Sequence, residues 1–188
     1  MTDSFIKLTQ FMAIHQLFRL GIYTLLSKII PSKGNGLKAG DMAPDFELPN
    51  QENKIVTLKH LRGHKVVLIF YPKDFTLGCT TQLCNIRDEY KLLQQHQLKI
   101  FGISTDGVNS HAAFVAKKQF PFDLLADAQK QVVKKFGVYD EIKFLGSTFS
   151  GTNRTTFIIS EQGIILHIIK NIHNLRHSSE IIKVLEHQ

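Results

Sequence analysis

The chain has 188 residues, of which 43% are hydrophobic, and a formal net charge of +7. This length and hydrophobic content fit one well-packed domain, and no interior segment has the composition of a linker to a second one. The basic residues are dispersed in runs no longer than the pairs Lys117-Lys118 and Lys134-Lys135, so the charge does not indicate a nucleic-acid partner.

Residues 1–36 form an N-terminal extension in our interpretation. Residues 5–30 are rich in Phe, Leu and Ile, and residues 31–36 suit a hinge. Most large apolar residues share one side of a helical projection, although His15 and Arg19 interrupt it, so we expect an amphipathic helix that contacts the membrane surface. The alternatives are a spanning helix, which Arg19 disfavours by about 2.5 to 3.5 kcal/mol, and a helix packed on protein. No Ala-x-Ala site follows, so a cleaved signal peptide is not expected.

Residues 37–188 are expected to form the domain itself. Its first half is predicted to contain a hairpin, a buried strand, a helix, a second buried strand and another helix, at residues 46–58, 66–71, 79–96, 98–104 and 110–118. The continuous apolar run Val66–Tyr71 is typical of a strand that is covered on both faces. A strand, a helix and a strand in this order predict a βαβ unit.

The second half is predicted to contain a short strand, a short helix, a loop, two strands and a closing helix. We place the regular elements at residues 121–125, 129–136, 155–160, 164–169 and 178–187. The turn Glu161-Gln-Gly163 joins the last two strands, and Ser178 or Ser179 is predicted to cap the closing helix. The whole order predicts an α/β fold with a central mixed sheet flanked by helices.

Both cysteines lie just after the first buried strand. Cys79 is predicted to lie in the opening turn of a helix, where unpaired N–H groups and the helix dipole favour a thiolate, so it is a candidate nucleophile. Cys84 follows five positions later and is a candidate resolving thiol. Two inert, buried thiols are the alternative. So small a number of cysteines, without a Cys-x-x-Cys pattern, indicates a reducing compartment, and we expect a cytoplasmic protein.

The sequence around these cysteines resembles the peroxiredoxins, specifically the bacterioferritin comigratory protein or PrxQ branch. The string Phe70-Tyr-Pro-Lys-Asp-Phe-Thr-Leu-Gly-Cys-Thr-Thr-Gln-Leu-Cys84 carries the resemblance together with Asn153-Arg154-Thr-Thr-Phe157. It extends from Leu37 to the last helix. Leu77 stands where that branch usually has Pro, and Gln82 stands where many members have Glu. The resemblance implies a thioredoxin-like fold and a thiol-dependent peroxidase.

The resemblance also implies a role for each site residue. Cys79 corresponds to the peroxidatic cysteine, which attacks hydrogen peroxide or an organic hydroperoxide and becomes a sulfenic acid. Pro72 would shield the sulfur, and the Thr76 hydroxyl, three residues before Cys79, would bond backbone, sulfur or peroxide oxygen unless it only caps the helix. Arg154 would stabilise the thiolate and the departing oxygen, because its fork of donors keeps its charge.

Helix geometry then predicts a conformational step. Residues five apart on an α-helix have Cα atoms about 8.7 Å apart, whereas a disulfide tolerates about 7 Å. The helix must therefore unwind before Cys84 reaches Cys79, and we expect thioredoxin or a similar dithiol to reduce the resulting disulfide. We expect a monomer or weak dimer without a cofactor or metal. His173 and His177 have the spacing of a helical metal pair but lack a third ligand nearby.

Two other functions compete with this interpretation. A general disulfide oxidoreductase uses Cys-x-x-Cys at the same junction, and the spacing here, Cys-x-x-x-x-Cys, disfavours it. A binding module or holdase anchored by the N-terminal helix would leave both cysteines structural.

Overall fold

The structure is a computed structural model that describes residues 36–144 and 147–187. The predicted helix over residues 5–30 lies outside these ranges. Within them, no helix combines the length and the apolar character that crossing a membrane requires.

A five-stranded mixed sheet forms the centre of the domain, in the order β5-β4-β3-β8-β9. The strands span Asp123–Ala126 (β5), Leu98–Ser104 (β4), Lys65–Phe70 (β3), Thr155–Ile159 (β8) and Ile165–Ile169 (β9). β3 pairs in parallel with β4 and antiparallel with β8, so both of its edges are hydrogen-bonded. The predicted βαβ unit and the mixed sheet are confirmed.

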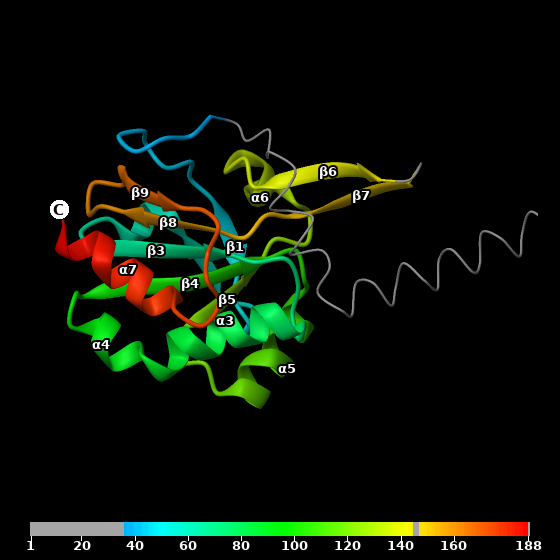
Figure 1. Ribbon diagram of the computed structural model, residues 1–188, viewed down its shortest axis with the longest axis horizontal. Coiled ribbons are helices and arrows are strands. Elements are labelled where there is room, and N and C mark those ends of the chain that lie inside the picture. Colours follow the sequence, from blue (N-terminus) through cyan, green and yellow to red (C-terminus); the bar gives the residue numbers. More distant parts are fainter. Residues whose placement is uncertain (1–35, 145–146, 188) are drawn as a thin grey trace, which may run out of the picture.

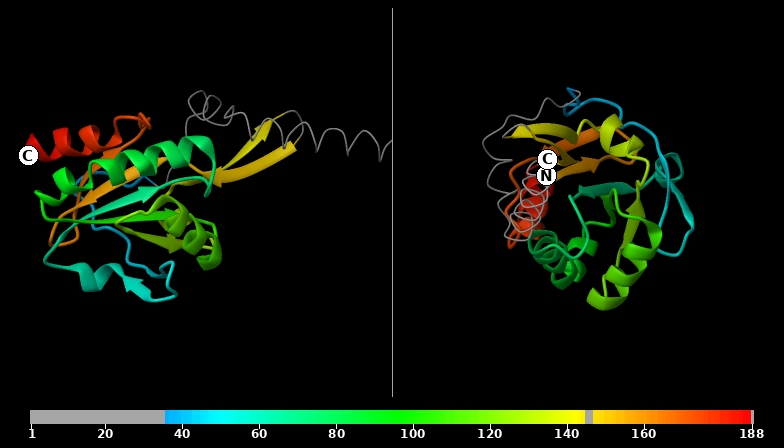
Figure 2. Two further views of the ribbon diagram at one scale, coloured as in Figure 1. Left: turned by 90° about the horizontal axis from the view of Figure 1, so that it is seen from below. Right: turned by 90° about the vertical axis from the view of Figure 1, so that its right-hand side faces the viewer.

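Two hydrophobic cores lie on opposite faces of this sheet. One contains Val67 and Ile69 of β3 and is covered by four helices: α3 (Leu77–Asp88), α4 (Tyr90–Gln94), α5 (Val108–Lys118) and α7 (His177–Glu186). The other contains Val66, Leu68 and Phe70 and is covered by three elements: the β1-β2 hairpin, the 3₁₀ turn η1 (Leu58–Leu61) and α6 (Gln131–Lys135). Figure 2 shows α3 and α7 on one side of the sheet and η1 on the other. Because successive side chains of a strand point to opposite faces, every residue of the apolar run is buried.

Two hairpins complete the fold. β1 (Glu47–Pro49) and β2 (Ile55–Thr57) form the predicted hairpin. β6 (Tyr139–Phe144) and β7 (Ser147–Thr152) form a second hairpin that extends away from the body of the domain (Figure 1), where we predicted a loop. β7 is rich in Ser, Gly and Thr and has no continuous apolar run that would indicate a strand, so the backbone pairing between β6 and β7 defines the hairpin.

Two helix predictions need correction. The single helix predicted over residues 79–96 starts earlier, at Leu77, and is divided at Glu89 into α3 and α4. Neither serine caps the closing helix, which begins at His177 after the N-cap residue Arg176. Ser178 lies inside the first turn, and the Asn85 side chain of α3 accepts its backbone N–H at 2.9 Å. A neighbouring helix thus satisfies this N–H group.

Candidate active site

Cys79 lies at the end of the central strand, in the first turn of the helix that follows. β3 ends at Phe70, and α3 begins at Leu77, so Cys79 is the third residue of the helix. Its side chain is buried in the core beneath α3. The first-turn N–H groups of a helix have no intrahelical acceptor, which makes this position favourable for an anion.

Arg154 lies beside Cys79 because its strand is the neighbour of β3. Thr155, the first residue of β8, pairs with Phe70, the last residue of β3. Arg154 Nη2 donates to Cys79 Sγ at 3.3 Å, and Nη1 donates to Gln82 Oε1. Within the described part of the chain, the buried Nε has no hydrogen-bond partner. The Nε–H donor of the guanidinium therefore remains unused.

Gly78 makes the close approach of Arg154 possible. A Cβ atom added at Gly78 would lie 3.2 Å from Arg154 Nη2 and 3.2 Å from Asn174 Nδ2. Few real Cβ contacts are so short, so a side chain at this position would press on the guanidinium. The absence of a side chain allows Arg154 to lie against the first turn of α3.

The loop between β3 and α3 holds Pro72 and Thr76. Pro72 lies two residues after the last residue of the strand and is partly buried. Thr76 is the N-cap residue, but its hydroxyl caps no N–H group and instead donates to the Lys73 carbonyl at 3.0 Å. The Thr76 hydroxyl therefore contacts the backbone and not the sulfur in this structure.

Asp74 fixes this loop through a buried network that the sequence reasoning missed. Its carboxylate accepts hydrogen bonds from Tyr71 Oη at 2.7 Å, Ser110 Oγ at 2.7 Å and His111 Nδ1 at 2.8 Å. Burial, followed by the charge of Asp74, raises the pKa of Tyr71 well above its usual value, so the phenol remains a donor. The available signal was the polar pair Ser110-His111 at the start of a helix that packs on an apolar sheet.

A second buried row of hydrogen-bonded side chains connects Arg154 to helix α7. The sequence did not predict this row either. Gln82 Nε2 lies 3.1 Å from His177 Nδ1, and His177 Nε2 lies 2.9 Å from Thr156 Oγ1. Burial, with a smaller contribution from the charge of Arg154, lowers the pKa of His177 to about 3. His173, its potential partner in a metal pair, is exposed, so the two histidines lie in different surroundings.

Cys84 lies on the same helix as Cys79. Both thiols are free, and Cys84 is partly buried against the core beneath α3. Because α3 is continuous from Leu77 to Asp88, helix geometry separates the two Cα atoms by about 8.7 Å. A disulfide needs a local opening of this helix.

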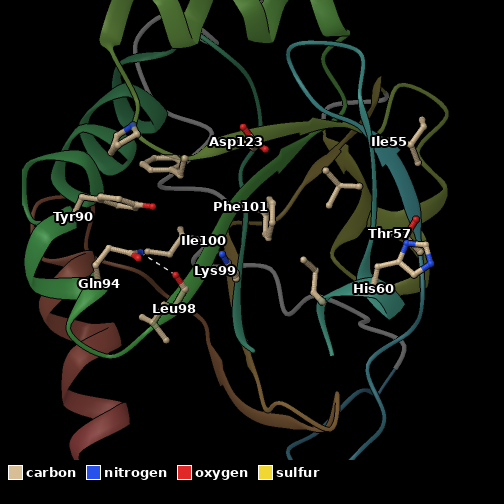
Figure 3. Close-up of a pocket in the computed structure, with 14 residues that line it drawn as sticks. Ile55, Thr57, His60, Tyr90, Gln94, Leu98, Lys99, Ile100, Phe101 and Asp123 are labelled. Carbon is tan, nitrogen blue, oxygen red and sulfur yellow. Dashed lines mark hydrogen bonds between the residues drawn. The ribbon is translucent and has the colours of Figure 1, made fainter. Parts of the chain in front are cut away.

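A separate hollow of about 480 Å³ lies elsewhere on the domain. Figure 3 shows it between β2 and η1 on one side and α4 on the other, with the start of β4 as its floor. Labelled residues such as His60, Tyr90 and Asp123 line it, and neither cysteine nor Arg154 does. The residues around Cys79 therefore constitute a different site.

Comparison with known proteins gives a consistent result. The sequence profile of the AhpC/TSA family matches residues 39–168. The putative peroxiredoxin Bcp of Haemophilus influenzae is 42% identical over 151 residues, which cover 80% of this chain and 97% of that protein. Peroxiredoxin Bcp of Escherichia coli is 38% identical over 152 residues, covering 81% of this chain and 97% of that protein.

Solved structures agree with the sequence matches. The bacterioferritin comigratory protein of Xanthomonas campestris superimposes with a TM-score of 0.72 at 30% identity, covering 76% of this chain and 90% of its own. A cysteine-to-serine mutant of PrxQ from Xylella fastidiosa gives 0.75 at 27% identity, covering 82% of this chain and 98% of its own. The fold is thus the expected thioredoxin-like one. The chain belongs to the AhpC/TSA family, in its Bcp or PrxQ peroxiredoxin branch, and is a thiol peroxidase.

Proposed function

We propose that Cys79 is the peroxidatic cysteine. Its thiolate attacks one oxygen of the hydroperoxide, the O–O bond breaks, and the sulfur becomes a sulfenic acid while the second oxygen takes a proton and departs as water or an alcohol. The contact of 3.3 Å between Arg154 Nη2 and Cys79 Sγ carries this proposal. A guanidinium at this distance is a charged donor that contacts the reacting sulfur directly.

Arg154 also stabilises the oxygen that departs. Its charge is permanent, and Nε–H is the donor that no protein group uses among the described residues. Thr76, Gly78 and Arg154 are partly exposed whereas Cys79 is buried, so a small peroxide reaches the sulfur between them. Donors aimed at developing charge in such a sheltered site are a large source of rate enhancement.

The substrates in this proposal are hydrogen peroxide and organic hydroperoxides. The Xanthomonas campestris relative has alkyl peroxide reduction activity. In this chain, Phe75 and Leu77 expose 46% and 82% of their surface near the first turn of α3. These apolar side chains provide a surface for the organic part of a hydroperoxide.

Cys84 is the resolving cysteine. Its thiol attacks the Cys79 sulfenic acid, which gives an intramolecular disulfide and water. The opening of α3 that brings the two together breaks the contacts of Gln82 with His177 and of Asn85 with Ser178. Thioredoxin or a similar dithiol then takes up the disulfide by exchange and is itself oxidised.

We also propose that residues 1–36 form an extension and residues 37–188 form the peroxiredoxin domain. The protein acts as a monomer or weak dimer in this proposal, and it is cytoplasmic. Two free thiols suit a reducing compartment. The Phe, Leu and Ile residues in the sequence of residues 5–30 support contact with a membrane surface. Fractionation of cells that express a chain without residues 1–36 tests this contact: unchanged membrane association contradicts it.

Replacement of Cys79 tests the main proposal. Cys79→Ser abolishes peroxide consumption with thioredoxin and thioredoxin reductase, whereas a binding module would never have consumed peroxide. Cys84→Ser permits one turnover, after which mass spectrometry finds Cys79 overoxidised or in a mixed disulfide. A reduced Cys79 in the peroxide-treated Cys84→Ser protein contradicts the scheme.

A further inference from the structure

Three elements meet in one closed row of polar side chains behind Cys79. The row runs from Arg154 to Gln82 of α3, then to His177 of α7 and Thr156 of β8. Gln82, Thr156 and His177 are each 0% exposed, so water does not satisfy their polar atoms. The buried polar atoms of these three side chains therefore depend on protein partners.

The donor and acceptor properties of the residues fix every orientation in this row. A guanidinium only donates, so the Gln82 atom that faces Arg154 is the carbonyl oxygen Oε1. Nε2 of the same amide then faces His177, and it also only donates. His177 Nδ1 must accept, which places the single imidazole proton on Nε2, directed at Thr156 Oγ1.

We propose that His177 is a positioning residue for the peroxidase reaction, which holds the Gln82 amide in the orientation that fixes Arg154 against Cys79. This inference rests on the proposed roles of Cys79 and Arg154. His177 lies at the start of α7, 98 positions from Cys79 along the chain.

Without an acceptor at His177 Nδ1, the orientation that Arg154 favours leaves the buried Nε2–H of Gln82 without a partner, so the amide shifts or rotates to find one. An amide has nearly the same shape after a rotation of 180°, and the rotated form directs Nε2–H at Arg154, where two donors repel each other. The guanidinium then loses its anchor at Nη1 and moves relative to the sulfur. Burial and the charge of Arg154 lower the pKa of His177 to about 3, so the Nδ1 lone pair is available as an acceptor at neutral pH.

A carboxylate at position 82 would not need His177 to hold its orientation. Both oxygens of a carboxylate accept, so every rotation presents an acceptor to Arg154. Gln82→Glu is therefore the matched background in which His177 loses its positioning task. A purely structural role of His177 would persist in that background.

The test is a double-mutant cycle that measures the second-order rate constant for hydrogen peroxide. We expect His177→Gln, which retains a donor near the Nε2 position but no acceptor for Gln82, to lower the constant about ten-fold. His177→Asn, which keeps an acceptor near the Nδ1 position, should cost less than about three-fold. In the Gln82→Glu background, His177→Gln should cost less than about two-fold.

Equal losses from His177→Gln in both backgrounds would overturn the inference, as would full activity of His177→Gln in the Gln82 background. If His177→Gln does not fold, the ring ¹⁵N spectrum of the wild-type protein decides, because a proton on Nδ1 of His177 contradicts the proposed orientation. Peroxide turnover that survives Cys79→Ser is a different failure, since it removes the proposed function itself.

Discussion

The carboxylate of Asp74 lies 2.8 Å from Nδ1 of His111, and this buried pair joins the loop ahead of Cys79 to helix α5. The other ring nitrogen, Nε2, lies 3.2 Å from the Leu125 carbonyl of β5. One histidine thus connects the loop, the helix and the sheet. This pair thus fixes the loop that leads into α3, and α3 itself is hydrogen-bonded to α7 through Gln82 and Asn85.

Removal of the histidine should leave a buried carboxylate without its partner. We expect His111→Phe to lower the free energy of unfolding by about 3 kcal/mol, because the buried Asp74 carboxylate then lacks one of its hydrogen-bond donors. Urea unfolding at neutral pH measures this change. Ser110→Ala, which removes a single hydrogen bond to the same carboxylate, is the matched control and should cost about 1 kcal/mol. Similar losses in both variants would contradict the role of the pair.

The stability of the protein should depend on pH through His177. The pKa of His177 is about 3 in the fold against an ordinary value of 6.5, so the unfolded chain binds more protons between these values. The contribution of neutral His177 is complete above pH 6.5 and declines as the pH falls. At pH 5 the loss amounts to about 2 kcal/mol. Urea unfolding at pH 7 and pH 5 should therefore show a weaker pH dependence in His177→Gln than in wild type; equal dependences would refute the assignment.

Gly78→Ala should lower the peroxidase activity with little effect on the stability of the protein. The added Cβ would lie 3.2 Å from Arg154 Nη2, so the guanidinium has to shift, and we expect the rate constant for peroxide to fall about ten-fold. The free energy of unfolding should stay within about 1 kcal/mol of wild type, because Ala is the better helix former. Gly107→Ala is the control, since a Cβ there meets nothing within 4 Å. An unchanged rate in Gly78→Ala would show that the guanidinium tolerates the displacement.

The link between α3 and α7 should control how fast the disulfide forms. Asn85→Ala removes the acceptor of the Ser178 N–H, which lies 2.9 Å from Asn85 Oδ1. We expect Cys79 sulfenic acid to convert to the disulfide about five-fold faster, because α3 opens with one contact fewer. Stopped-flow measurement after a single equivalent of peroxide follows this step. A slower conversion would mean that the contact stabilises the opened form.

The sequence predicted those parts of the fold that have a local signature. The apolar runs of β3 and β4 identified the centre of the sheet, and the order of the strands placed Arg154 next to the strand that leads to Cys79. The partners of Gln82 and Asp74 were not predictable in this way. His177 lies 95 positions from Gln82, and His111 lies 37 positions from Asp74, so only the packing of the helices on the sheet brings them together.

The hydrophobic cores on the two faces of the sheet have different roles. β3 is anchored along both edges, and, among the described residues, the packing beneath α6 and the β1-β2 hairpin includes no residue of α3. If Cys84 resolves Cys79 as proposed, each catalytic cycle opens part of one helix while the hydrophobic core on the other face of the sheet keeps its native contacts. The protein can then unfold locally in every turnover without approaching global denaturation.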